Sequence, residues 1–145
     1  MDPAQIKDVS LLTDLAYILS MGHNLDMGTA ELSKNFFEGA LKREPNNRRA
    51  NYLMGMFLVS TRKYQFDSVP YLEKALELGE KDAEFTLGLI AVNQGRRDEG
   101  LRMLKNYSDD YPNNEHVKQI IEAIEKEELE FKTSDSKIIE VEIKE

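Results

Sequence analysis

Apolar side chains recur at helical spacing along most of the chain, and they fall into pairs of helices joined by short turns. The clearest pair begins at Asp82, and its first helix is expected to end at Gly95. Asp98 is a suitable cap for the second helix, and Pro112 prevents that helix from continuing. The apolar stripes are Phe85, Leu87, Leu89, Ile90 and Val92 in the first helix and Leu101, Met103, Leu104 and Tyr107 in the second.

Two earlier stretches have the same layout. In the nearer one, Asn47 is expected to start a helix and Gly79 to end the helix that follows it. In the first, a helix over about residues 6–20 precedes a long turn beginning at residues 21–24, and a second helix ends before Pro45. The sequence therefore predicts successive helix pairs.

Two glycines mark corresponding positions in the second and third pairs. Gly55 and Gly88 lie 33 residues apart, each in the middle of a predicted helix. A glycine there costs about 1 kcal/mol relative to alanine. We interpret the repeated cost as a packing requirement, in which the paired helix crosses too closely to leave room for a side chain.

These residues resemble the tetratricopeptide motif, which has a period of 34 residues. The match is fullest over 81–114, is partial over 47–80, which needs one inserted residue and lacks the closing proline, and is weakest over 5–46, which has about five extra residues. The residues that carry it are Leu87, Gly88, Ala91, Gly95, Gly100, Leu104, Tyr107 and Pro112 in the last repeat, Met54, Gly55, Leu58, Tyr64, Ser68, Leu72 and Ala75 in the middle one, and Phe37, Ala40 and Pro45 in the first.

The resemblance implies an all-α fold, namely a right-handed α-α solenoid of about three helix-turn-helix repeats in a domain spanning residues 1–132. The positions that shape the repeats would be Gly55, Ala75, Gly88, Gly100 and Pro112. A capping helix is expected over 114–131, with Val117, Ile120, Ile121, Ile124 and Leu129 on its buried side.

The acidic tail, residues 133–145, has a different pattern. Ile139, Val141 and Ile143 alternate with charged residues, which is the period of a strand. A lone strand is unstable, so three alternatives stay open: a disordered end, an edge for dimerisation, or an extended segment in the protein's own groove.

Composition limits the partners. The 145 residues carry a net charge of -8, which disfavours nucleic acid and anionic membranes and favours basic or neutral proteins. There are 0 cysteines, and neither a secretory leader nor a membrane span is visible, so the cytoplasm is the expected location. A leader removed during processing stays open.

Catalytic and metal-binding patterns are not found. His23 falls in a predicted turn and His116 in the first turn of the capping helix, where surface roles are expected. The acidic pairs 109–110 and 127–128 lack the spacing of a calcium loop and are interpreted as solvated charge. We therefore expect no enzyme activity, no metal and no cofactor.

The resemblance also implies a binding surface, because the first helix of each repeat in the family lines the concave side. Its apolar and aromatic character suits a peptide or an amphipathic helix and disfavours a clamp for a carboxyl-terminal tail. The residues at these positions are Arg49, Tyr52, Met56, Val59 and Ser60 in the middle repeat and Asp82, Phe85, Leu89, Val92 and Asn93 in the last.

Two functions follow from this surface. The first is an interaction module, either an adaptor or a small chaperone that holds a segment of a partner protein. The second is a structural or assembly subunit that forms a homodimer through the groove or the tail. A further alternative is that the first helix, the tail or a second subunit covers the aromatic side chains.

Overall fold

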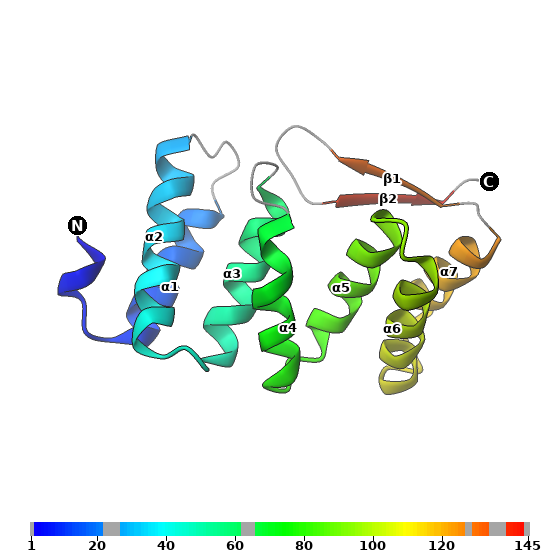
Figure 1. The fold of residues 1–145 in the computed structure, drawn as a ribbon, viewed down its shortest axis with the longest axis horizontal. Helices are drawn as coiled ribbons and strands as arrows, with labels where there is room; N and C mark the ends of the chain where they lie inside the picture. The colour runs from blue at the N-terminus through cyan, green and yellow to red at the C-terminus, as the bar shows by residue number, and fades with distance from the viewer. Residues whose placement is uncertain (1, 22–26, 62–65, 127–128, 134–138, 144–145) are drawn as a thin grey trace.

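The computed structural model describes residues 2–21, 27–61, 66–126, 129–133 and 139–143. Over these residues the chain forms the 3-10 helix η1, a second 3-10 turn at residues 66–68, seven α-helices and two strands (Figure 1). In chain order they are η1 (Pro3–Gln5), α1 (Val9–Ser20), α2 (Met27–Arg43), α3 (Arg48–Ser60), α4 (Val69–Glu77), α5 (Asp82–Asn93), α6 (Arg97–Asp110), α7 (Glu115–Glu125), β1 (Leu129–Thr133) and β2 (Ile139–Ile143).

The helices pack in pairs of chain neighbours. The most extensive helix contacts join α1 to α2, α5 to α6 and α3 to α4, while α4 also packs on α5 and α6 on α7. Figure 1 shows the helices following one another in chain order along the long axis of the molecule. The prediction of an all-helical domain is confirmed for η1 through α7, and no helix in the described ranges is long and apolar enough to span a membrane.

The apolar core is continuous from one helix pair to the next, because each of its three clusters joins three successive helices. The first cluster joins α1, α2 and α3, the second α3, α4 and α5, and the third α5, α6 and α7. Phe37 and Phe57 link the first and second pairs, with ring centroids 5.8 Å apart. The first pair therefore belongs to the same core even though its sequence match is weakest.

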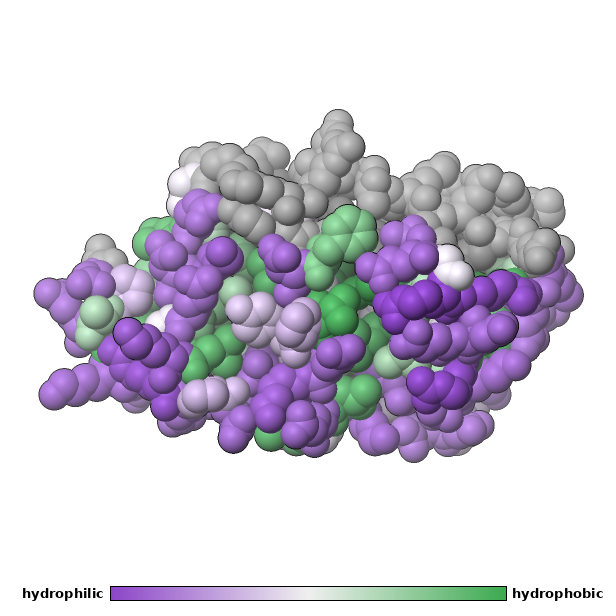
Figure 2. Space-filling view, in the orientation of Figure 1, coloured by the Kyte–Doolittle hydropathy of each residue, from purple (hydrophilic) through white to green (hydrophobic). Residues whose placement is uncertain are grey.

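The outer surface is mostly polar where it can be seen. Figure 2 shows one face that is largely hydrophilic, with hydrophobic residues gathered toward its middle.

Asparagine side chains start two of the helices in the same way. Asn47 Oδ1 accepts a hydrogen bond from the Ala50 amide at 2.9 Å, and Asn114 Oδ1 accepts one from the Val117 amide at 3.2 Å. Each asparagine follows a Pro-Asn pair, so the same turn connects the first pair to α3 and the third pair to α7. The predicted role of Asn47 as a helix start is confirmed.

Gly79 and Gly95 end α4 and α5, as predicted, in a left-handed conformation with φ of 98° and 82°. Each supports the same closing hydrogen bonds. The Glu80 amide donates to the Ala75 carbonyl at 2.8 Å, and the Arg96 amide donates to the Ala91 carbonyl at 2.8 Å.

Helices cross closely at the two mid-helix glycines. A Cβ added at Gly55 would lie 2.6 Å from Leu72 Cδ2, and one added at Gly88 would lie 2.9 Å from Leu104 Cγ. Leu72 and Leu104 are fully buried, so neither has free space into which to move. The packing interpretation of both glycines is confirmed.

The first pair crosses at the corresponding point without a glycine. Ser33 Oγ in α2 donates a hydrogen bond to the Ala16 carbonyl in α1 at 2.8 Å. In the third pair, a Cβ added at Gly100 in α6 would lie 2.7 Å from the Gly88 carbonyl oxygen in α5. In both pairs the second helix thus lies against a backbone carbonyl of the first helix. Ala16 therefore corresponds to Gly88, and Ser33 to Gly100.

Two predicted boundaries are wrong. Asp98 does not cap α6, because this helix already begins at Arg97 and places Asp98 in its first turn, near the positive end of the helix dipole. The capping helix ends at Glu125 and not at residue 131, because the chain turns and continues as β1.

The C-terminal tail is not a lone strand. The predicted strand period is confirmed, since β2 is extended, and β2 pairs antiparallel with β1 in a register that places residue 131 opposite residue 141. Of the three alternatives for the tail, an extended segment agrees with the form of residues 139–143 in this structure. Residues 134–138 and 144–145 of the tail lie outside the described ranges.

Candidate functional site

A pocket of about 430 Å³ lies between α3 of the second helix pair, α5 and α6 of the third pair, and the capping helix α7. Because its walls come from residues far apart in the sequence, the pocket depends on how the helices pack. Its lining residues are Tyr52, Met56 and Val59 from α3, Asp82, Phe85, Thr86 and Leu89 from α5, Tyr107 from α6, and His116 and Ile120 from α7.

The apolar part of the lining combines fixed and accessible side chains. Val59, Leu89 and Ile120 are buried and belong to the core clusters beneath the pocket. Met56 and Phe85 are only half-buried and pack against those clusters. The pocket therefore offers apolar surface on a packed floor, which is the arrangement that an apolar side chain of a ligand requires.

A carboxylate is held at the polar side of the pocket. The Tyr107 hydroxyl donates a hydrogen bond to Asp82 Oδ1 at 3.0 Å. The Tyr107 ring is fixed between those of Phe85 and Tyr111, with centroids 5.5 and 4.7 Å away. Within the described part of the chain, Asp82 forms no ion pair, so its charge is available to a ligand.

The two tyrosines of the pocket stay neutral around physiological pH. Burial, followed by the hydrogen bond to Asp82, raises the pKa of Tyr107 to about 12. Burial also raises the pKa of Tyr52, with smaller contributions from the negative charges of Asp82 and Glu80. Asp82 is thus the fixed negative charge of the lining.

Replacing Tyr107 by phenylalanine removes this hydroxyl and keeps the packed ring. We expect the free energy of unfolding to fall by about 1 kcal/mol at neutral pH, because the bond to Asp82 is lost. The folded protein holds the Tyr107 proton more tightly than the unfolded chain does, so this contribution is fully present below a pH of about 10 and is lost as the pH rises through about 12. Urea unfolding of both proteins from neutral to alkaline pH measures the difference. Equal losses of stability in the wild type and in Tyr107→Phe over that pH range would contradict a stabilising hydrogen bond between Tyr107 and Asp82.

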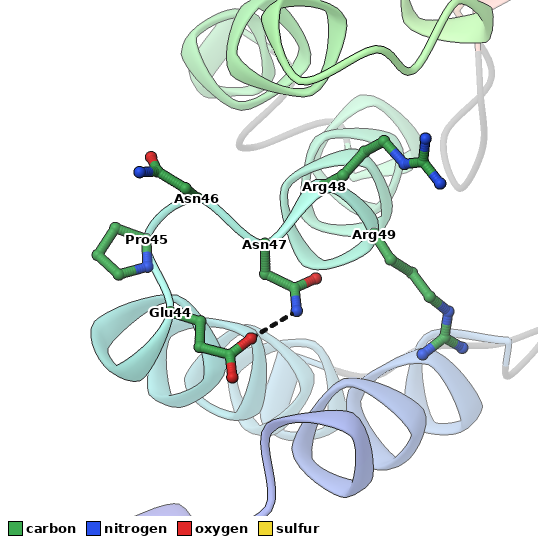
Figure 3. A pocket seen from close by; sticks show the side chains of 6 residues that line it. All are labelled: Glu44, Pro45, Asn46, Asn47, Arg48 and Arg49. Atoms are coloured by element: carbon green, nitrogen blue, oxygen red, sulfur yellow. Dashed lines mark hydrogen bonds between the residues drawn. The ribbon is translucent and has the colours of Figure 1, made fainter.

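Two other pockets lie beside turns between helix pairs. One, of about 580 Å³, is lined by consecutive residues from Glu44 to Arg49, and the other, of about 440 Å³, by residues from Asp110 to Asn114. Figure 3 shows Asn47 turned toward Glu44, to which its amide donates at 2.8 Å, while Arg48 and Arg49 extend away from the turn. Each of these pockets is the notch beside one local turn, so we do not assign them a ligand.

No protein-family model matches this chain, and no curated protein matches it.

Six of the residues predicted for the groove line the pocket, namely Tyr52, Met56, Val59, Asp82, Phe85 and Leu89. The other predicted residues do not. Arg49 lies at the turn of Figure 3, where its Nη2 is 2.7 Å from Asp14 Oδ1. Val92 packs against α6 at Gly100, and Asn93 is exposed at the end of α5.

Four lining residues were not predicted: Thr86, Tyr107, His116 and Ile120. The sequence marked Tyr107 and Ile120 as members of buried stripes, and both are buried, but each also borders the pocket. His116 was assigned to the surface of the capping helix, where it is exposed and faces the pocket as well. The signal that could have placed His116 at the pocket was its spacing in α7. His116 and Ile120 lie four positions apart and therefore share one side of the helix.

The other candidate chemical groups do not gather at one place. In the ranges that the structure describes, no cluster of three His, Cys, Asp or Glu side chains is positioned to hold a metal. Burial raises the pKa of Glu84, but Glu84 is not part of the pocket lining. His23 and the acidic pair 127–128 lie outside the described ranges.

Proposed function

We propose that the chain is a tetratricopeptide-like, right-handed solenoid. The helix crossings at Ala16, Gly55 and Gly88 support this proposal, because each brings the two helices of a pair together at a matching position. The three core clusters, each shared by three successive helices, are the packing that a stack of repeats requires.

We further propose that the protein is an interaction module, an adaptor or small chaperone, that binds a peptide or an amphipathic helix of a partner protein. The observation that carries this proposal is the pocket between α3, α5, α6 and α7, with half-buried Met56 and Phe85 above a packed apolar floor. Its volume lies within the range of about 300 to 1,000 Å³ typical of ligand sites. An apolar side chain of the partner would occupy it as an anchor.

The charge of the pocket defines the partner segment further. Asp82 is oriented by Tyr107, and the whole chain carries a net charge of -8. A lysine or arginine next to the anchoring side chain would therefore meet a favourable charge, whereas a carboxylate would be repelled. This supports the expectation that the pocket is not a clamp for carboxyl-terminal tails.

The C-terminal hairpin favours the second function, an assembly subunit. It is a two-stranded sheet in the described part of the chain, and the outer edge of a strand is a template for pairing with another chain. Homodimerisation through this edge stays a prediction.

Photocrosslinking from inside the pocket tests the interaction function. In the cell of origin, Phe85 is replaced by the photoreactive residue p-benzoylphenylalanine and the cells are irradiated. We expect a discrete covalent adduct with another protein, because the new side chain lies where the anchor of the partner binds. Adding Tyr52→Ala and Met56→Glu to this variant should remove the adduct.

Phe66 provides the control, because it is an exposed phenylalanine outside the pocket. The same photoreactive residue at position 66 should give no such adduct. The proposal fails if position 85 yields no protein adduct, or if positions 66 and 85 yield the same ones.

A further inference from the structure

The pocket between α3, α5, α6 and α7 combines two kinds of surface in one space. Its floor is apolar and is formed by the buried side chains of Val59, Leu89 and Ile120. Its polar side carries the carboxylate of Asp82, which the Tyr107 hydroxyl holds through the hydrogen bond to Oδ1. A side chain that fills the whole pocket therefore needs an apolar stem and a group that suits a carboxylate.

Aromatic rings from three helices line the pocket beside this carboxylate. Tyr52 of α3 and Phe85 of α5 are half-buried, so part of each ring is accessible to a ligand. Tyr107 of α6 packs on Phe85, with ring centroids 5.5 Å apart and ring planes inclined by 42°. Burial raises the pKa of both tyrosines and Asp82 raises it further, which places both hydroxyls near the same carboxylate.

The charge beside these rings is negative. Lys81, which lies between Glu80 and Asp82 in the sequence, is directed elsewhere, since its Nζ is 3.3 Å from Asp110 Oδ2. Within the described ranges, neither Glu80 nor Asp82 forms an ion pair, and no lysine or arginine lines the pocket. A carboxylate next to the electron-rich faces of aromatic rings is an environment that attracts a cation.

The lining favours an alkylated ammonium over a primary one. Asp82 Oδ1 already accepts from Tyr107, so the carboxylate offers mainly Oδ2 to a ligand. A primary ammonium has three donors and is strongly hydrated, so in this pocket some of its donors would lie against the apolar floor. A trimethylammonium group has no donors, and its methyl groups can contact ring faces while its charge is attracted to Asp82.

We propose that the pocket binds a trimethylated lysine side chain of the partner segment, with the methylene stem on the apolar floor and the cationic head beside Asp82, Tyr52 and Phe85. This inference rests on the proposed interaction function and names the anchor which that function requires. A single side chain then provides both the apolar contact and the positive charge that suit the lining.

A protein side chain fits this charge distribution better than a choline headgroup does. In phosphocholine a phosphate follows closely after the trimethylammonium group. The carboxylates of Glu80 and Asp82 would repel that phosphate, as would the net charge of -8 on the whole chain. The side chain of a trimethylated lysine carries no anion.

Methyl NMR of the full chain tests this inference with two probes of the same shape. The first is Nα-acetyl-trimethyllysine methylamide, and the second is its neutral isostere, in which a tert-butyl group replaces the trimethylammonium group. We expect both to shift the methyl resonance of Met56 in the pocket and not those of Leu78 at the end of α4. The charged probe should bind about fivefold more tightly than the neutral one. Nα-acetyl-lysine methylamide and phosphocholine should both bind more weakly than the trimethylated probe.

Asp82→Asn removes the charge and keeps an oxygen that can accept from Tyr107. This variant should bind the charged and neutral probes about equally. Asp109→Asn is the matched control, because it removes an exposed carboxylate outside the pocket and should keep the full preference for the charged probe. Asp82 also lies in the first turn of α5, so circular dichroism checks that the helices are intact. The comparison of probes on the wild type needs no variant.

Equal affinity of the wild type for the charged and neutral probes would overturn the inference and leave a purely apolar anchor, with the interaction function intact. An unmethylated lysine probe that binds as tightly as the trimethylated one, or a Met56 resonance that the trimethylated probe does not shift, would also overturn it. So would an equal loss of preference in Asp82→Asn and Asp109→Asn. Photocrosslinking from position 85 decides the interaction function separately, so the two failures are distinguishable.

Discussion

Replacing Phe37 by alanine will lower the free energy of unfolding by about 3 to 5 kcal/mol, the usual cost of removing a fully buried aromatic ring. The Phe37 side chain has no exposed surface, and its ring packs on that of Phe57 in the next helix pair. The substitution leaves a cavity between α2 and α3 that closely packed helices can fill only in part. Urea unfolding followed by circular dichroism measures the loss.

Phe66→Ala is the matched control, because it removes the same ring from an exposed position. We expect its effect to stay within about 0.5 kcal/mol. A loss at Phe37 no greater than that at Phe66 would show that the first helix pair does not share the core of the second.

Replacing Gly100 by alanine should also destabilise the fold, by about 2 kcal/mol. An added Cβ would lie 2.7 Å from the Gly88 carbonyl oxygen and 3.0 Å from the Val92 amide nitrogen. Both atoms belong to the α5 backbone, so the clash is relieved only if the two helices separate. Overpacking therefore outweighs the gain of about 1 kcal/mol that alanine brings to a helix. Thermal and urea unfolding both report the change.

Gly39→Ala provides the comparison, since Gly39 lies inside α2 and has more room. Its nearest neighbour would be Pro3 Cβ at 3.3 Å, in a short segment at the end of the chain. We expect unchanged or slightly higher stability for this variant. Equal losses for Gly39→Ala and Gly100→Ala would contradict the close crossing of α5 and α6.

The helix pairs were predictable because their signals are local. The Asn47 cap, the left-handed Gly79 and Gly95, and the glycines at the crossings each act within one turn or between neighbouring helices. Spacing alone therefore located them. Asp98 shows the limit of this reasoning, because a residue suited to a cap fits equally well in the first turn, where its charge is favourable.

The strand pairing was not predictable in the same way. The apolar spacing of α7 continues toward residue 129, so the sequence extended the helix to residue 131, whereas α7 ends at Glu125. What distinguishes β1 from a further helical turn is its pairing with β2, about ten residues later along the chain. Such pairing depends on contacts between segments, which the local pattern does not contain.

Much of the candidate pocket followed from the repeat spacing, and the rest depends on how the helices come together. Tyr52, Met56, Phe85 and Leu89 lie at predicted inward positions of α3 and α5. Tyr107 reaches Asp82 from 25 residues away, on a helix that the sequence assigned only to the core. Its hydroxyl orients the carboxylate of Asp82, a residue that the sequence placed in the groove without this partner.

Methyl NMR of the full chain with its partner segment tests the proposed function most directly. A synthetic peptide spanning the segment that crosslinks to position 85 is titrated into protein with labelled methyl groups. We predict shifts for the pocket methyl groups of Met56, Val59, Leu89 and Ile120, and none for Leu78 at the end of α4. Binding that shifts resonances elsewhere and leaves these four unchanged would contradict the proposal.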